Sequence, residues 1–526
     1  MTFSKPNRSD ATFTSNRTPK SVCPFSGMCA TCSEDCIGLC EIGKSAFRGT
    51  EIQYPQPFGT ISSASEKDYP VDYSHFNIMG STVGAHGIEA DSDVAIFPNV
   101  SVEREIGPGE NKIKVKLPII IAGMGSTNIA HKHWDSLGAG AAISGVILVI
   151  GENVVGMDPH AEIKNGRVVK SPNLEFRVRS FMDFYEGYGT IALQGNVEDT
   201  RLGVPEYAIQ ELGVEAIEIK WGQGAKDIGG EVNTDSLERA LQLKRRGYIV
   251  IPDPEDPQVQ EAYIKGAFKE FERHSRVSMV EEESFHKRVE ELRKAGAKYI
   301  FLKTGAFRPA DLARAVKYAS DAKIDLLTVD GAGGGTGMSP WRMMNEWGIP
   351  MVELHSLLYQ YCEKLAAKGK FIPHIAVAGG FVLEDQIFKG LALGAPYFKL
   401  IGMARAPLTA AFVGRNVKEA VDSGKIPRHY SQYGKTIEQI FITASDLKNK
   451  YGSDFEKIPA GALGIYTYFE RIKQGLRQFM CGARKCSLDH ITRDDIAALT
   501  REAAEVSGVK YIMELDKEEA EKILEG

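Results

Sequence analysis

The sequence predicts an α/β protein in which a (β/α)8 TIM barrel follows an N-terminal cysteine-rich segment and precedes a helical C-terminal extension. Short apolar runs alternate with segments of helical period, and many of these runs end in glycine. Several runs are apolar throughout, which is typical of parallel strands buried on both faces. Eight alternations of strand and helix form the barrel pattern. A doubly wound open sheet is the structural alternative.

Eight segments are the expected barrel strands, and the segments between them have helical character. The strands are 118–123, 141–145, 216–222, 248–253, 299–305, 326–335, 375–380 and 397–402. A ninth run, 189–196 (GTIALQGN), is placed in an insertion after the second strand. Before the fifth strand, Phe285, Val289 and Leu292 share one face of an expected helix, with charged residues opposite.

We divide the 526 residues into a disordered leader (1–20), a cysteine-rich segment (21–116), the barrel (117–415) and a helical extension (416–526). Lys and Arg number 63 against 69 Asp and Glu, without a basic stripe, which argues against nucleic-acid binding. No apolar run is long enough to cross a membrane, and the N-terminus lacks the apolar stretch of a signal peptide. We expect a cytoplasmic protein without a membrane partner.

Cysteines are concentrated in two places. The candidate metal ligands are Cys23, Cys29, Cys32, Cys36, Cys40, Cys481 and Cys486. Thiolates on a tight loop can converge on the irons of an iron–sulfur cluster, and a [4Fe–4S] cluster would use four of these seven. A closed zinc site is the main alternative, and disulfides are disfavoured without a secretion signal. Cys362, in the helix-like stretch LLYQYCEKL, is interpreted as a buried, inert thiol.

Glycines after the strands predict a ligand at one end of the barrel. Ligands of such barrels bind at the carboxyl ends of the strands, and glycine lets backbone N–H groups approach an anion. Gly379, Gly380 and Gly402 follow the last two strands, where barrels commonly hold a phosphate. The stretch 330–340 (DGAGGGTGMSP) exposes further amides, and it fits neither a Rossmann fingerprint nor a P-loop. Tight turns alone are the alternative explanation for these glycines.

Taken in order, five motifs resemble the FMN-binding synthase domain of glutamate synthase, over roughly residues 118–415. They are IKWGQGAKDIGG (219–230), DGAGGGTGMSP (330–340), GIPMVELH (348–355), AGGF (378–381) and ALGAPYFKLIGMA (392–404). Upstream, AGMGSTNIAHKHWDSLGAG (122–140) is similar to the first strand and helix of that family.

The resemblance implies FMN, with its phosphate on the loops of Gly379, Gly380 and Gly402. Lys303 would face the N1–C2=O edge of the flavin, where reduction gathers negative charge, and Lys226 would attract a substrate carboxylate. There is an alternative to each of these roles: Lys303 could extend from the barrel rim into solvent, and Lys226 could be a solvated loop lysine. The candidate catalytic residues are Lys226, Lys303 and Glu152. The candidate cofactor-binding residues are Met124, Gly125, Ser126, Ser144, Lys220, Gln223, Lys303, Asp330, Gly331, Gly333, Gly334, Gly335, Thr336, Gly379, Gly380, Gly402 and Met403.

The chain departs from the family at positions that concern the substrate. Glu231 stands where the family has Gln, and its carboxylate would repel a dicarboxylate such as 2-oxoglutarate. The family's loop after the second strand is matched only by Ser144-Gly145 and a displaced Gly151-Glu152, and DPEDP (253–257) replaces its histidine loop. No glutaminase domain precedes the barrel, so ammonia would come free or from a separate glutaminase subunit.

The expected activity is oxidoreduction on a small 2-oxo or amino acid: reductive amination of 2-oxoglutarate to glutamate, or the reverse oxidation. Because no NAD(P) motif is visible, electrons would come from ferredoxin or an NAD(P)H-oxidising subunit. Other FMN-barrel activities, such as 2-hydroxyacid or dihydropyrimidine oxidoreduction, are alternatives. A non-catalytic electron-transfer or assembly subunit is a third interpretation, and a homo-oligomer is left open.

Overall fold

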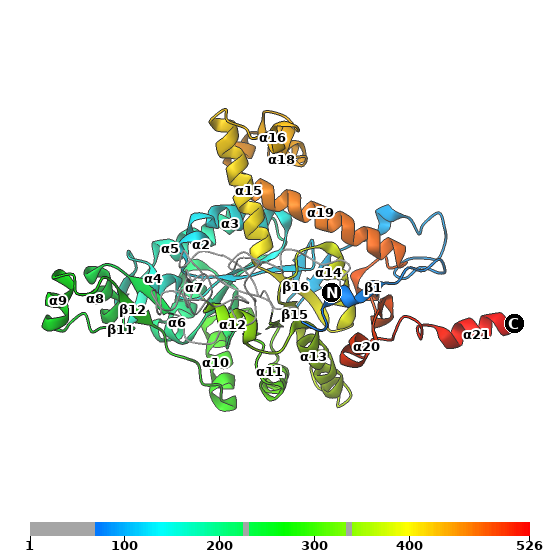
Figure 1. The fold of residues 1–526 in the computed structure, drawn as a ribbon, viewed down its shortest axis with the longest axis horizontal. Helices are drawn as coiled ribbons and strands as arrows, with labels where there is room; N and C mark the ends of the chain where they lie inside the picture. Colours follow the sequence, from blue (N-terminus) through cyan, green and yellow to red (C-terminus); the bar gives the residue numbers. More distant parts are fainter. Residues whose placement is uncertain (1–68, 225–230, 333–338) are drawn as a thin grey trace, which may run out of the picture.

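The computed structural model describes residues 69–224, 231–332 and 339–526, and its centre is a closed barrel of eight parallel strands (Figure 1). The strands are β4 (Ile119–Met124), β5 (Ile147–Ile150), β8 (Thr190–Gly195), β9 (Ala216–Lys220), β13 (Tyr299–Thr304), β14 (Leu326–Asp330), β15 (His374–Ala378) and β16 (Phe398–Met403). Pairing of β16 with β4 closes the barrel, with Ile401 opposite Ile119. The predicted barrel is confirmed, and the open sheet is excluded.

Helices surround the barrel and bury its outer surface. They are α2 (Asn128–Lys132), α3 (Trp134–Ser144), α4 (Val154–Met157), α5 (Pro172–Met182), α6 (Val197–Leu202), α7 (Val204–Leu212), α10 (Glu282–Ala295), α11 (Pro309–Asp321), α12 (Trp341–Glu346), α13 (Met351–Ala366), α14 (Glu384–Leu393) and α15 (Arg405–Asp422). In α10, Phe285, Val289 and Leu292 are the buried residues, as the sequence predicts.

Two of the predicted barrel strands are wrong. Residues 141–145 end helix α3 and reach Gly145, and the second strand begins at Ile147. Helix α3 is buried on almost every side, so it lacks the polar face that would reveal its period. The third barrel strand is β8, which the sequence analysis placed in an insertion. The run 248–253 instead contains β11, an edge strand outside the barrel.

The insertions follow the second and fourth barrel strands. After β5, a hairpin of β6 (Glu162–Lys164) and β7 (Arg167–Lys170) precedes α5. After β9, a small lobe contains β10 (Glu231–Thr234), α8 (Leu237–Arg245), β11 (Ile249–Ile251), α9 (Pro257–Ile264) and β12 (Phe271–His274). Its three strands form an antiparallel sheet in the order β10-β12-β11, and the lobe occupies one end of the long axis in Figure 1.

The described N-terminal residues close the lower end of the barrel, the end where the barrel strands begin. They form η3 (Tyr73–His75), β1 (Phe76–Ile78), η4 (Phe97–Asn99), β2 (Arg104–Ile106) and β3 (Ile113–Val115). Ile106, Ile113 and Val115 of the β2–β3 hairpin are buried in one cluster with residues of the barrel strands, such as Ile120 and Phe301. The upper end, where the strands finish, is left for ligands.

The C-terminal region is largely helical, as predicted, and it packs back on the barrel. It comprises α16 (Arg428–Ser431), α17 (Ile437–Ile440), α18 (Ala444–Tyr451), η5 (Gly452–Lys457), α19 (Ala460–Gly482), η6 (Leu488–His490), η7 (Arg493–Asp495), β17 (Ile496–Ala498), α20 (Arg501–Ser507) and α21 (Lys517–Glu525). The long helix α19 lies against α15 and α3, and β17 pairs with β1 near the other end of the chain (Figure 1). Within the described ranges, no helix has the length and apolar character needed to cross a membrane.

Candidate functional site

Charged and polar side chains gather at the upper end of the barrel. Lys220 ends β9, Lys303 and Asp330 lie at the ends of β13 and β14, and Glu152 follows β5. Parallel strands finish at the same end of a barrel, so residues far apart in the sequence meet there. Four residues predicted from the sequence are therefore brought to one place.

Lys220 connects two of the loops above the barrel. Its Nζ donates to Oε1 of Glu152 at 2.6 Å and to Oε1 of Gln223 at 3.0 Å. The Lys220 side chain is 11% exposed and that of Glu152 is 23% exposed, so this ion pair is largely shielded from solvent. Glu152 is thus held by a cation at the barrel mouth.

Lys303 is buried within the barrel and forms a second ion pair. Its Nζ lies 3.3 Å from Oδ2 of Asp330, and its side chain is 6% exposed. Burial acts to lower the pKa of Lys303, but the carboxylates of Asp330 and Glu218 outweigh it and leave that pKa raised. Lys303 is therefore a fixed positive charge in a low-dielectric interior, and the structure does not place it snorkelling at the rim.

Gln194 and Glu218 are polar residues of this site that the sequence motifs do not reveal. Gln194, in β8, donates through Nε2 to Oε1 of Glu218, in β9, at 2.5 Å, and both residues are 1% exposed. Thr328 of β14 donates to the other oxygen of Glu218 at 3.5 Å. Oε1 of Gln194 is buried and has no hydrogen-bond partner among the described residues. A polar residue within the otherwise apolar run TIALQG was the signal in the sequence, and assigning that run to an insertion hid it.

Asp199 anchors the turn that carries Glu152. Its carboxylate accepts from the backbone N–H of Asn153 at 3.0 Å and of Asn196 at 3.3 Å, and it is 1% exposed. Burial raises the pKa of Asp199 to about 7, against the effect of these two hydrogen bonds. Asn153 has a left-handed backbone (φ 65°), so the turn after β5 is sharp.

The predicted glycines differ in their structural surroundings. A Cβ on Gly125 would collide with the carbonyl oxygen of Glu152, so this glycine lets two loops touch. Gly379 and Gly380 have φ of 140° and 111°, which favour glycine, and they follow β15 as a phosphate-binding loop would. Close packing of loops therefore accounts for part of the glycine pattern, and the phosphate loop stays a prediction.

The other predicted residues divide into three groups. At the strand ends at the upper end of the barrel lie Met124, Gly125, Ser126, Gly331, Gly402 and Met403. Ser144 is separated from them, because it ends α3 before β5 begins and so lies at the lower end of the barrel; its place at the end of a strand was wrong. Outside the described residues lie Lys226, Gly333, Gly334, Gly335 and Thr336.

The predicted metal ligands are only partly covered by the structure. Cys23, Cys29, Cys32, Cys36 and Cys40 lie outside the described residues. Cys481 and Cys486 are free thiols near the end of α19, and burial raises the pKa of Cys486. The part of the chain that is described contains no group of three potential metal ligands, so it does not by itself fit a cluster. Cys362 is buried in α13, and burial raises its pKa to about 12, in agreement with an inert thiol.

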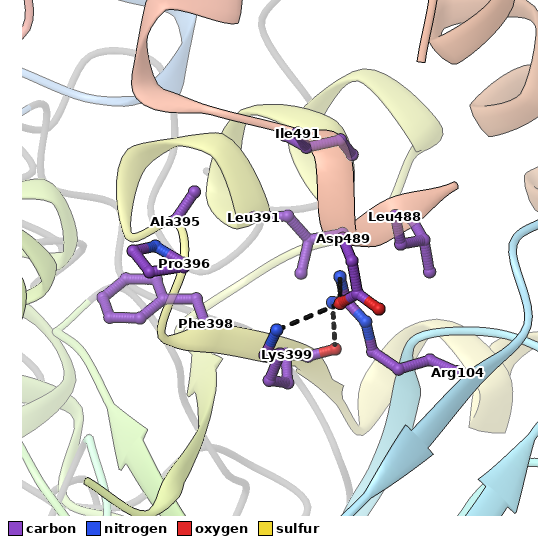
Figure 2. A pocket seen from close by; sticks show the side chains of 9 residues that line it. All are labelled: Arg104, Leu391, Ala395, Pro396, Phe398, Lys399, Leu488, Asp489 and Ile491. Carbon is purple, nitrogen blue, oxygen red and sulfur yellow. Dashed lines mark hydrogen bonds and ion pairs between the residues drawn. The ribbon is translucent and has the colours of Figure 1, made fainter. Parts of the chain in front are cut away.

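A small pocket at the lower end of the barrel is lined by apolar residues and by three charged ones (Figure 2). Arg104 of β2 donates to Oδ1 of Asp489 at 3.0 Å and to the carbonyl oxygen of Lys399 at 3.1 Å. Lys399 of β16 also donates to Oδ1 of Asp489, at 3.0 Å. The two cations hold the pKa of Asp489 below its usual value, although burial acts to raise it. Because it is at the end where strands begin, this pocket is distant from the candidate site.

Comparison with known proteins relates the barrel to one family. Residues 273–412, which include β13 to β16, match the conserved region in glutamate synthase. This part of the barrel is therefore similar to the synthase domain of glutamate synthases. A curated relative, the archaeal glutamate synthase [NADPH] of Archaeoglobus fulgidus, is 25% identical over 304 residues, which are 57% of this chain and 49% of that protein. The chain thus spans about half the length of the glutamate synthase that it matches.

Two solved structures that are similar to the chain have low sequence identity to it. A double mutant of flavocytochrome b2 with pyruvate bound is 14% identical, with a TM-score of 0.46 over 82% of this chain and 78% of that chain. A mutant chimera of (S)-mandelate dehydrogenase is 12% identical, with a TM-score of 0.43 over 81% of this chain and 88% of that chain.

Proposed function

We propose that this chain is an FMN-dependent oxidoreductase of the glutamate synthase type, acting on a small 2-oxo acid or amino acid. The observation that carries the proposal is the pair of shielded ion pairs, Lys220–Glu152 and Lys303–Asp330, at the upper end of a barrel of this family. Bound FMN would supply hydride transfer, which protein side chains alone cannot perform.

The described residues fit a flavin in their chemistry. Gln194 has a buried carbonyl oxygen that has no partner within the described ranges, which suits an N–H of a polar ring. Lys303 supplies a fixed positive charge that would stabilise the negative charge of a reduced flavin. Gly379 and Gly380 would hold the phosphate, and Lys220 and Gln223 would line the other side of the site.

The substrate assignment rests on the family resemblance, on Lys220 at the barrel mouth, and on Lys226 in the sequence motif 219–230. We propose that Lys226 attracts a substrate carboxylate and that Glu152, oriented by Lys220, holds or moves a proton on the substrate. Reductive amination of 2-oxoglutarate to glutamate, or the reverse oxidation, is the reaction of this type. The name of the archaeal relative, which includes NADPH, supports electron supply by a nicotinamide-oxidising partner, and ferredoxin is the other donor we propose.

We further propose that four of the seven clustered cysteines hold an iron–sulfur cluster, on the strength of their spacing. Zinc is the competing occupant. A location in the cytoplasm and a separate glutaminase subunit stay predictions from the sequence.

The test is an anaerobic absorbance spectrum of the purified full chain, with flavin, iron and sulfide quantified on the same sample. We expect stoichiometric FMN and a loss of flavin absorbance on adding the amino acid substrate. In Lys220→Gln, the loss of the cation beside Glu152 should weaken FMN binding about tenfold or more. Lys298→Gln, at an exposed ion pair near the start of β13, is the matched control and should bind FMN normally. A colourless chain that contains zinc and does not take up FMN would refute the proposal.

A further inference from the structure

The contact between Gln194 and Glu218 has a defined polarity. A carboxylate can only accept hydrogen bonds, so the amide of Gln194 must turn its NH2 group toward Glu218. Thr328 donates to the second carboxylate oxygen, which leaves Glu218 fully engaged with donors. The carbonyl oxygen of Gln194 is then forced to point the other way.

That carbonyl oxygen is buried beside the first barrel strand. A Cβ added to Gly123 of β4 would lie 3.1 Å from Oε1 and 3.2 Å from Nε2 of Gln194, so the whole amide fits here because position 123 has no side chain. Residues 218 and 220 are two positions apart on β9, so their side chains point to the same, inner face. The same holds for residues 328 and 330 on β14. The Glu218–Thr328 layer therefore lies one step below the Lys220 and Asp330 side chains of the candidate site.

We propose that Glu218 is a positioning residue that fixes the amide of Gln194, so that its carbonyl oxygen accepts a hydrogen bond from an N–H of the bound cofactor. This inference rests on the proposed function. The isoalloxazine ring of oxidised FMN carries a single N–H, at N3, so N3 is the atom that this acceptor recognises.

The cations near Glu218 favour its carboxylate form, which is a pure acceptor. Burial raises the pKa of Glu218, and the charges of Lys303 and Lys220 oppose that rise together with the hydrogen bonds from Gln194 and Thr328. An amide in place of the carboxylate could both donate and accept. Glu218→Gln would therefore allow Gln194 to take either orientation without a change of shape.

The experiment compares the binding of FMN and of 3-methyl-FMN, which lacks the N3 hydrogen, to the full chain freed of flavin. The wild-type chain should bind FMN at least about tenfold more tightly than the methylated analogue. In Glu218→Gln this ratio should fall to about threefold or less. Glu215→Gln, at the partly exposed residue just before β9, is the matched control and should keep the wild-type ratio.

A double exchange separates positioning from a general structural effect. In Gln194→Glu combined with Glu218→Gln, the direction of the contact is reversed: the amide at residue 218 donates to the carboxylate at residue 194, and the other oxygen of residue 194 again accepts from the cofactor. We expect the tenfold ratio to return. A wild-type ratio in Glu218→Gln, or no recovery in the exchanged pair, would overturn the proposal. A wild-type ratio near one would overturn it while leaving FMN binding intact, whereas a chain that binds neither flavin would refute the proposed function itself.

Discussion

At the lower end of the barrel, Arg104, Lys399 and Asp489 come from three separate parts of the chain: the N-terminal hairpin, β16 and the C-terminal region. At the upper end, Lys220, Lys303 and their carboxylate partners all lie on barrel strands or on the loops that follow them. The lower cluster joins distant segments, and the upper cluster lies at the end of the barrel where we propose that a ligand binds. Similar ion pairs therefore join distant segments at one end and, under the proposed function, bind a ligand at the other.

This contrast predicts that removing a charge lowers the free energy of unfolding by different amounts at different positions. Loss of a buried partner leaves an uncompensated charge, whereas loss of a charge near solvent is compensated by water. The largest effects should thus come from groups inside the barrel, and a moderate effect from the partly exposed lower cluster.

The largest expected effect is that of Lys303→Met. It would leave Asp330 and Glu218 without their cation inside the barrel, and we expect the free energy of unfolding to fall by about 3–5 kcal/mol. Urea denaturation measures this change. Lys298→Met, at an exposed ion pair, should leave the free energy of unfolding unchanged. Equal losses in the two variants would show that burial does not decide the cost.

Asp199 should make stability depend on pH. Its pKa is about 7 in the folded protein and about 3.9 in an unfolded chain, so the folded state binds the proton more tightly. Stability should therefore fall as pH rises from about 4 to about 7, by a contribution on the order of 4 kcal/mol. Asp199→Asn should flatten the profile of unfolding free energy against pH in this window. The exposed Asp183→Asn is the control, and a profile that is unchanged in Asp199→Asn would contradict the assignment.

The smallest effect should come from the lower cluster. Asp489→Asn removes the carboxylate shared by Arg104 and Lys399, and we expect a loss of about 1–2 kcal/mol in the free energy of unfolding, since Asp489 is 63% exposed. FMN affinity should not change, because the cluster is at the opposite end of the barrel. Asp494→Asn, in an exposed pair with Lys510, is the control. Weaker FMN binding in Asp489→Asn would contradict the claim that the lower cluster has no part in FMN binding.

Much of the barrel was predictable because its strands are short, apolar runs that end in glycine. Six of the eight strands were assigned correctly, and so were Lys220, Lys303 and Asp330 at their ends. These assignments depend on local pattern and on the rule that ligands lie where barrel strands finish. They needed no knowledge of which residues touch.

Tertiary structure decided what local pattern could not distinguish. A fully buried helix such as α3 and a buried strand have the same apolar composition, so residues 141–145 were taken for a strand. Because residues 141–145 were assigned as the second strand, the predicted barrel did not include β8 and its residue Gln194. The role of Gln194 depends on Glu218, 24 positions away, and only the closed barrel brings their side chains into contact. The sequence by itself determined the type of fold and its charged strand ends, whereas the direction of a buried hydrogen bond was decided only when neighbouring strands met.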